Sequence, residues 1–143
     1  MRTVERLLEV KGYDIWSITP DASVYKAVKL MADKAIGALL VLESGNLVGI
    51  MSERDCTRRV ILKERAPRET LVREIMTSDV ITVRPNQTVE ECMSLVTAKR
   101  IRHLPVLADG QLIGIVSIGD LVKGIISEQE FMIQQLENYI QGG

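Results

Sequence analysis

The sequence has very few of the residues on which common catalytic and metal sites depend. Its 143 residues include one histidine, His103, two cysteines and only 3% aromatic residues. A single histidine leaves little for a metal cluster or a Ser-His-Asp triad. Cys56 and Cys92 form no C-x-x-C pair, so we expect neither a metal site nor a disulfide framework, but two reduced, partly buried thiols in helices.

Long apolar runs and an excess of positive charge are missing as well. No run approaches the roughly 20 apolar residues that span a bilayer, and Met1–Arg6 leads into no signal-peptide core. We therefore expect a cytoplasmic protein with no membrane partner. The net charge of −1 and the few aromatic side chains for stacking bases also argue against nucleic acid as a partner.

What the sequence does contain is an internal repeat. The segment GIMSERD at 49–55 recurs 65 residues later as GIVSIGD at 114–120, with its glycine, apolar pair, serine and aspartate in place. The same offset carries Pro20 to Pro85 and continues without a gap through the intervening turns and apolar faces. Because one unit of about 50 residues buries too little surface to be secure alone, two copies predict a pseudo-twofold pair that shares one core.

Apolar periodicity and turn residues divide the chain into five segments. Each repeat has the pattern strand, helix, strand, strand, helix, and a polar stretch with Pro67 separates the two copies. We predict an α/β (α+β) fold with two tandem β-α-β-β-α repeats and extra terminal helices. The predicted segments are an N-terminal helix at 1–12, the first repeat at 13–63, a linker at 64–73, the second repeat at 74–127 and a C-terminal helix at 128–143.

The two terminal helices have apolar faces that lie outside the repeat. In the C-terminal segment, Met132, Leu136, Tyr139 and Ile140 fall on one helical face. A monomer can cover such faces with its own core, but two terminal amphipathic helices favour an oligomer surface. We expect a homodimer.

The Ser-x-x-Asp pattern that ends each repeat has two interpretations. It is a helix capping box, in which the serine oxygen accepts a backbone N–H and the acid accepts another. It also places a hydroxyl and a carboxylate at one helix start, where they can bind the hydroxyls and phosphate of a nucleotide. The residues are Ser52 and Asp55 in the first repeat, and Ser117 and Asp120 in the second.

The doubled pattern resembles a pair of CBS domains, known as a Bateman module, over about residues 13 to 127. The resemblance is carried by Ile75-Met76-Thr77, by Val83-Arg84-Pro85, by the segment RHLPV at 102–106 and by the two Gly-hydrophobic-x-Ser-x-x-Asp endings. The whole chain looks like small stand-alone bacterial proteins made of one such pair, and is also similar to certain plant organelle proteins.

The resemblance implies two small α/β units packed sheet to sheet, two clefts between them, and a flat disc-like dimer of two pairs. The clefts of such modules bind adenosine-containing ligands and serve sensing and regulation. For this chain we expect AMP or another adenine nucleotide (ADP or ATP), or NAD, and no required cofactor. The position-by-position resemblance implies that Asp120 binds both ribose hydroxyls, Ser117 the ribose or phosphate, and the apolar strand residues Val80, Ile81 and Val83 flank the adenine.

Basic residues make the two expected clefts unequal. The resemblance places phosphate contacts at Arg102 and His103, where the first repeat has Gly37 and Ala38. The first repeat instead has Arg54 and Arg58, four apart and so expected on one helix face, which suits a phosphate. The alternatives are an ordinary solvated helix face for the arginines and a hydrogen-bonded structural role for His103.

Three functions compete at this point. The first is a non-catalytic energy or redox sensor that binds a nucleotide and thereby alters its dimer and a protein partner that it regulates. The second is a ligand-free interaction or scaffold module. The third, an enzyme such as a nucleotide hydrolase, is disfavoured because no paired-carboxylate cleft, and no nucleophile with a base at suitable spacing, can be recognised.

Overall fold

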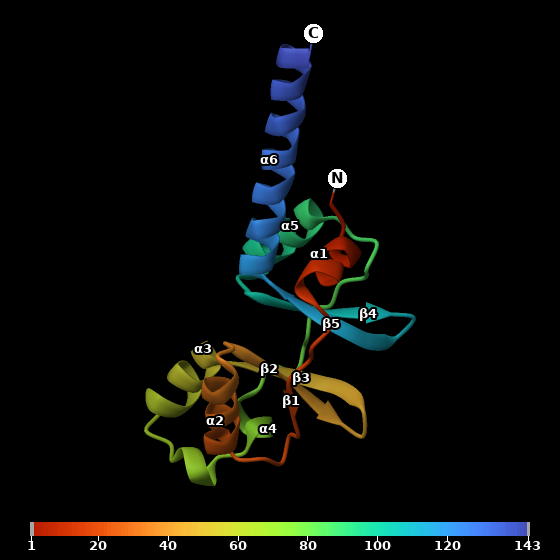
Figure 1. The fold of residues 1–143 in the computed structure, drawn as a ribbon. Coiled ribbons are helices and arrows are strands. Elements are labelled where there is room, and N and C mark those ends of the chain that lie inside the picture. Colours follow the sequence, from red (N-terminus) through yellow and green to blue (C-terminus); the bar gives the residue numbers. More distant parts are fainter. Residues whose placement is uncertain (1, 143) are drawn as a thin grey trace. The chain divides into compact units, whose positions relative to one another are not determined.

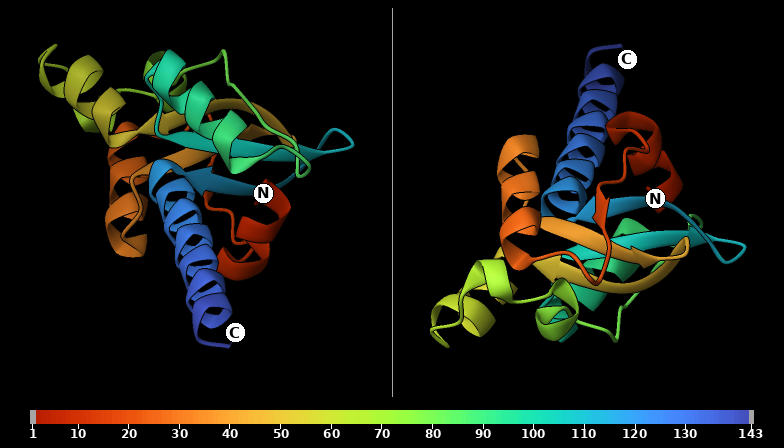
Figure 2. Two further views of the ribbon diagram at one scale, coloured as in Figure 1. Left: turned by 90° about the horizontal axis from the view of Figure 1, so that it is seen from above. Right: turned by 90° about the horizontal axis from the view of Figure 1, so that it is seen from below.

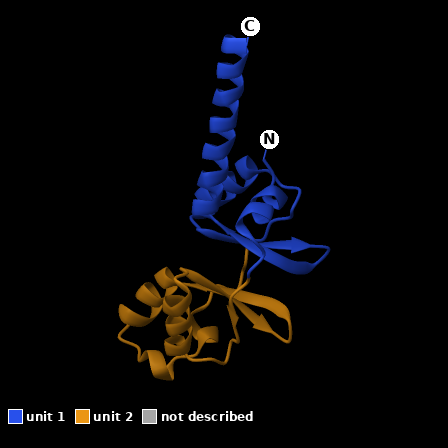
Figure 3. Cartoon of the chain, in the orientation of Figure 1, with its two compact units in different colours: residues 1–14, 82–143 blue, residues 15–81 orange. Residues whose placement is uncertain are grey.

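The computed structural model describes residues 2–142 and divides the chain into two compact units, shown in Figure 3. Unit 2 comprises residues 15–81, and unit 1 combines residues 1–14 with residues 82–143. The mixed α/β class and the two predicted repeats are confirmed. Residues 2–14, whose helix was predicted as an extra outside the repeats, fold with the second repeat.

Unit 2 contains the first repeat in the predicted β-α-β-β-α order (Figure 1). Its elements are β1 (Ser17–Ile18), α2 (Val24–Lys34), β2 (Ala38–Glu43), β3 (Asn46–Ser52), α3 (Glu53–Cys56), the π-helical turn η1 (Thr57–Ile61), the 3-10 turn η2 (Pro67–Glu69) and α4 (Val72–Ile75). Strand β2 lies between β1, which is parallel to it, and β3, which is antiparallel. The first strand of the repeat is short, with only two residues.

Unit 1 repeats this architecture with one change. Its elements are α1 (Val4–Lys11), α5 (Val89–Lys99), β4 (His103–Ala108), β5 (Gln111–Ser117) and α6 (Ile118–Gly142). Strands β4 and β5 form an antiparallel hairpin, and a single parallel bridge from Val83 to Val106 takes the place of the first strand. Both hairpins also have a register shift at matching positions, between Val41 and Leu42 and between Val106 and Leu107.

Both hairpins turn through two residues with positive φ. These are Ser44 and Gly45 in unit 2, at 52° and 81°, and Asp109 and Gly110 in unit 1, at 52° and 77°. Two consecutive residues of this kind are what a tight type I′ hairpin needs, and glycine adopts the second without strain. The repeat therefore extends to the backbone conformation of the turns.

The cores follow the predicted apolar faces. In unit 2 the buried cluster consists of Ile18, Val24, Ala27, Met31, Leu39, Val41, Met51, Cys56, Val60, Val72 and Ile75. The corresponding buried side chains of unit 1 include Val83, Val89, Cys92, Val96, Leu104, Val106, Val116 and Leu121, together with Val4, Leu7 and Leu8 from α1. Helix α1 is thus part of a core and not an external attachment.

Helix α1 occupies in unit 1 the place that α4 occupies in unit 2. Val4 N–H donates to the Gln87 carbonyl at 2.9 Å, and Val72 N–H donates to the Ala22 carbonyl, the equivalent position of the first repeat, at 2.9 Å. Likewise the Val89 N–H donates to the Arg2 carbonyl, as the Val24 N–H does to the Thr70 carbonyl. Helix α4 therefore spans the end of the segment expected as a linker and the start of the predicted second repeat, both of which fold in unit 2, and the N-terminal helix is its counterpart.

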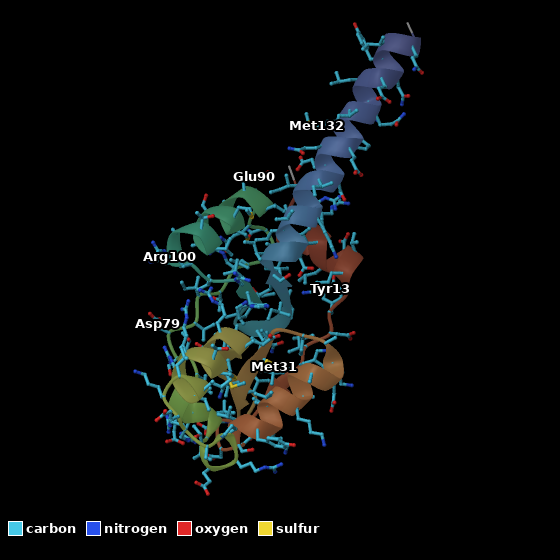
Figure 4. All side chains as sticks on the ribbon, turned by 90° about the vertical axis from the view of Figure 1, so that its left-hand side faces the viewer. Tyr13, Met31, Asp79, Glu90, Arg100 and Met132 are labelled. Atoms are coloured by element: carbon cyan, nitrogen blue, oxygen red, sulfur yellow. The ribbon has the colours of Figure 1, made fainter. Side chains whose placement is uncertain are left out.

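Helix α6 is a single rod of 25 residues, so the predicted helix at 128–143 has no separate start (Figures 1 and 2). Its first turns pack against α1, α5 and β5, with Leu121 and Gly124 buried. Its distal part extends past the rest of unit 1, and Figure 4 shows Met132 on that part. No helix in the described chain is both long enough and apolar enough to cross a membrane.

Candidate functional site

The serine and aspartate that end each repeat sit at the junction between a hairpin strand and a helix. Ser52 is the last residue of β3 and Ser117 the last of β5, and α3 and α6 begin at the next residue. The Asp55 N–H donates to Ser52 Oγ at 3.2 Å, and the Asp120 N–H donates to Ser117 Oγ at 3.1 Å. These contacts are the first half of a capping box.

The aspartates complete that box in both repeats. Asp55 Oδ2 accepts from the Ser52 N–H at 2.9 Å, and Asp120 Oδ2 accepts from the Ser117 N–H at 2.8 Å. The capping interpretation therefore describes the local structure correctly. It leaves part of each carboxylate for a ligand. All the side-chain contacts that the structure gives Asp55 and Asp120 are made by Oδ2, and Oδ1 takes part in none of them.

Asp120 differs from Asp55 because it has a cationic partner from outside the repeat. Lys11 Nζ, at the end of α1, donates to Asp120 Oδ2 at 2.6 Å and to the Ile115 carbonyl at 2.7 Å. Burial favours the neutral acid, but the hydrogen bonds from Lys11 and Ser117 outweigh it and lower the pKa of Asp120. Asp120 is therefore a charged acceptor at neutral pH, held in a fixed orientation.

Lys11 was not among the predicted site residues. The signal that could have found it is a shared spacing: Val4, Leu7 and Leu8 match Val72, Ile75 and Met76 in their separation. That match indicates that the N-terminal helix packs like the helix at 72–75, and so belongs beside the second repeat with its terminal lysine near that repeat's aspartate.

His103 and Arg102 lie at the same end of unit 1 as Ser117. His103 is the register partner of Ser117 in the β4–β5 ladder, and the Ile118 N–H donates to the Arg102 carbonyl at 2.8 Å. Burial and the positive charges of Lys11 and Arg102 lower the pKa of His103, against an opposing effect of Asp120. The structure thus brings together the second repeat's predicted serine, aspartate, arginine and histidine, with His103 neutral at pH 7.

The two arginines of the first repeat lie in different helical segments. Arg54 is half-buried in α3, whereas Arg58 is exposed in the π-helical turn, where hydrogen bonds run from i to i+5. Four residues are close to one turn in either kind of helix, so the shared helix face expected of Arg54 and Arg58 stays a prediction. Within residues 2–142, neither arginine side chain makes a hydrogen bond or an ion pair.

The predicted adenine-flanking residues do not form a strand of their own. Val80, Ile81 and Val83 lie in an extended connection in which Val83 alone makes a bridge. The Val83 side chain is 1% exposed, its N–H donates to the Pro105 carbonyl, and its carbonyl accepts from the Leu107 N–H. Only Val80 and Ile81, which are half-buried, keep accessible side chains for a ligand, and Val83 is a core residue.

The predicted site residues divide between the units. Unit 2 holds Ser52, Arg54, Asp55, Arg58, Val80 and Ile81, and unit 1 holds Val83, Arg102, His103, Ser117 and Asp120.

Comparison with known proteins gives a consistent family match. The family model described as CBS domain matches twice, at residues 9–62 and 72–127. The mitochondrial CBS domain-containing protein CBSX3 of Arabidopsis thaliana is 41% identical over 151 residues, covering 99% of this chain and 73% of the plant protein.

Solved structures agree with this match. A putative signal-transduction protein with CBS domains from Burkholderia ambifaria is 50% identical, with a TM-score of 0.86 over 89% of this chain and 96% of that one. A hexameric CBS-CP12 protein from bloom-forming cyanobacteria is 29% identical, with a TM-score of 0.76 over 84% of this chain and 66% of that one.

Proposed function

Since this chain belongs to the CBS-domain family, we propose that it is a non-catalytic regulatory module that binds an adenine nucleotide at the Ser-x-x-Asp ends of its repeats. The family is one of regulatory modules, and none of the comparisons indicates a catalytic family. The observation that carries the proposal is the charged carboxylate of Asp120, fixed beside Ser117 at the start of α6. The module acts as an energy or redox sensor.

The chemistry of this end suits a ribose phosphate. An ionised carboxylate accepts hydrogen bonds from hydroxyl groups, each contributing about 1.5–3 kcal/mol when shielded from water. The N-terminal turn of α6 offers the partial positive charge of a helix start, which favours a phosphate or another anion. AMP is the simplest ligand with both groups, and ADP, ATP and NAD carry the same adenosine phosphate.

The two repeats are unequal partners in this proposal. The second repeat combines Asp120 with Lys11, Arg102 and His103, whereas the first has Asp55 with Arg54 and Arg58, whose side chains make no hydrogen bond within residues 2–142. We expect tighter binding in the second repeat, because its carboxylate and cations are held together by hydrogen bonds and strand pairing.

A ligand-free scaffold module is the second candidate function. It is favoured by the capping boxes, because Ser52, Asp55, Ser117 and Asp120 each have a structural role that would retain them without any ligand. The two candidates predict different effects of an aspartate-to-asparagine change. In a nucleotide-binding module the change lowers ligand affinity, whereas in a ligand-free scaffold it lowers only the stability of the helix.

Isothermal titration of the full chain with AMP, ATP and NAD tests the proposal. Asp120→Asn is expected to weaken binding at least about tenfold, the value of one charge-assisted bond, while Asp33→Asn on the exposed face of α2 leaves affinity unchanged. Nucleotide affinity that is identical in the wild type, Asp120→Asn and Asp55→Asn would overturn the proposed site. Absence of binding by the wild type would favour the scaffold function.

The proposal includes a homodimer formed through α6. Val122, Ile126, Gln129, Ile133, Leu136 and Ile140 follow each other at spacings of four, three, four, three and four residues. The apolar members are between 41% and 77% exposed. A 3.5-residue apolar period is the pattern of a helix that pairs with another helix in a coiled coil, and a second copy supplies an identical seam. The cytoplasmic location expected from the sequence stays a prediction.

A further inference from the structure

Unit 1 contains a pocket of about 370 Å³ between α1 and α6. The two helices lie side by side in both views of Figure 2. The lining includes three cationic residues, Arg2, Lys11 and Lys123, as well as the carboxylate of Asp120 and the apolar Leu7 and Gly124. The volume lies in the range of small-molecule sites, for which about 300–1,000 Å³ is usual.

The charges that line this pocket do not balance. Lys11 is paired with Asp120, and Asp120 is the one acid in the lining. Among residues 2–142, Arg2 and Lys123 have no hydrogen-bonded acid, so two positive charges face the pocket unneutralised. A phosphate monoester or a longer phosphate chain carries the complementary charge.

The geometry of Lys11 leaves it able to serve a ligand as well. A lysine ammonium has three N–H donors. Two of them are used, by Asp120 Oδ2 at 2.6 Å and by the Ile115 carbonyl at 2.7 Å. The third remains for an oxygen in the pocket, with the nitrogen already fixed in place.

We infer that this pocket takes the phosphate groups of the nucleotide whose ribose is bound at Asp120, with Arg2, Lys11 and Lys123 as the phosphate-binding residues. The inference rests on the proposed function and deepens it, because it assigns the phosphate end to α1 and α6 of a single unit. It also gives the N-terminal helix, which packs in the core of unit 1, a direct part in selecting among nucleosides, monophosphates and triphosphates.

The first repeat lacks the equivalent cations. The matching hydrogen bonds of α1 and α4 make Thr70 the counterpart of Arg2, and α4 ends at Ile75, before any position that could correspond to Lys11 at the end of α1. Thr70 is 3% exposed and its hydroxyl donates to the Ala66 carbonyl, so it faces the core. A phosphate pocket between two helices of this kind is therefore expected at the second repeat only.

Calorimetric titration of the full chain with adenosine, AMP and ATP tests this inference. The wild type should bind ATP more tightly than adenosine. Arg2→Met and Lys123→Met should each weaken ATP about tenfold and leave adenosine unchanged, because each removes one charged contact to phosphate. Lys29→Met, an exposed lysine of α2 in unit 2, is the matched control and should change neither affinity.

Two results separate this inference from the function on which it rests. If Asp120→Asn removes adenosine binding while the Arg2 and Lys123 variants bind ATP like the wild type, the nucleotide site stands and the phosphate assignment is overturned. The same holds if both variants weaken adenosine and ATP equally. If the wild type binds neither compound, the proposed function and this inference both fail.

Discussion

His103 is the one histidine of the sequence and lies beside two cationic residues. Burial, Lys11 and Arg102 lower its pKa below the ordinary value of 6.5, so the folded state binds this proton less readily than the unfolded state. Stability linked to His103 is therefore complete above pH 6.5 and decreases as the pH falls from there towards the lower folded-state pKa.

We predict that the wild type loses stability between pH 7.5 and pH 5.5, and that His103→Gln loses less over the same interval. Urea unfolding at the two pH values measures both free energies. An unfolding free energy of the wild type that is flat, or that rises as the pH falls, would contradict the direction given to the histidine.

The two thiols are predicted to be unreactive in the folded protein. Burial raises the pKa of Cys56 to about 11, with the help of Asp55 and Glu53, and burial with Glu91 raises the pKa of Cys92 to about 11. The reactive thiolate is therefore scarce at neutral pH. Titration with a thiol reagent should be slow in buffer and rapid for both cysteines in denaturant. Fast labelling of either in the folded state would show that it is accessible.

At the scale of elements, α1 is held against β5 by a close approach at Gly114. A Cβ atom built there would lie 2.8 Å from Leu8 Cδ2, and the equivalent atom at Gly49 would lie 2.5 Å from Met76 Sδ. A methyl group at either position would therefore force the neighbouring Leu8 or Met76 side chain to move. The repetition of this glycine at positions 49 and 114 could be seen in the sequence. The close contact that explains it could not, because Leu8 is more than a hundred residues away from Gly114 along the chain.

Gly114→Ala should therefore push α1 away from the hairpin and cost about 1–3 kcal/mol of unfolding free energy, as overpacking usually does. Gly119→Ala is the control, because its Cβ would meet only Ser117 Oγ at an ordinary 3.5 Å. Chemical denaturation compares the two. Equal stability of Gly114→Ala and the wild type would show that α1 accommodates the methyl group.

The helices show where sequence patterns are sufficient and where they are not. Serine and threonine caps at Ser23 and Thr88, and the paired turns, were predictable because their signals are local. The π-helical turn at Thr57–Ile61 and the unbroken length of α6 were not. Gly124 lies within α6, although glycine often ends a helix. Its role is in packing, because a side chain there would collide with Leu7 of α1.

For the whole molecule, the offset of 65 residues predicted the architecture of both repeats, down to matching register shifts. The packing of α1 beside the second repeat was not predicted, because α1 matches α4 at an offset of 68 residues and not at the 65 that relates the repeats. This also explains the incomplete site: Ser117, Asp120 and His103 are neighbours as expected, while Lys11 was missed since it comes from α1.

The α6 seam predicts the association state. Ile133→Glu places a charge at the centre of the exposed seam and should convert the dimer into a monomer, as judged by light scattering after gel filtration. Gln134→Glu adds the same charge one position away, outside the 4-3-4 spacing, and should remain dimeric. A dimeric Ile133→Glu protein would show that the dimer forms through another interface. A monomeric wild type would contradict the proposed homodimer and would indicate that another protein covers the apolar face of α6.

Thermal unfolding with a panel of ligands tests the central claim, that this CBS-domain chain binds an adenine nucleotide. The protein is first stripped of carried-over ligand and then heated with AMP, ADP, ATP, NAD, NADH or S-adenosylmethionine. A ligand at 100 times its dissociation constant stabilises by about 2.7 kcal/mol, and each kcal/mol raises the midpoint by about 2–4 °C for a chain of this size. We predict a rise of several degrees with at least one adenine nucleotide, and a smaller rise in Asp120→Asn. An unchanged midpoint with every ligand would contradict the account.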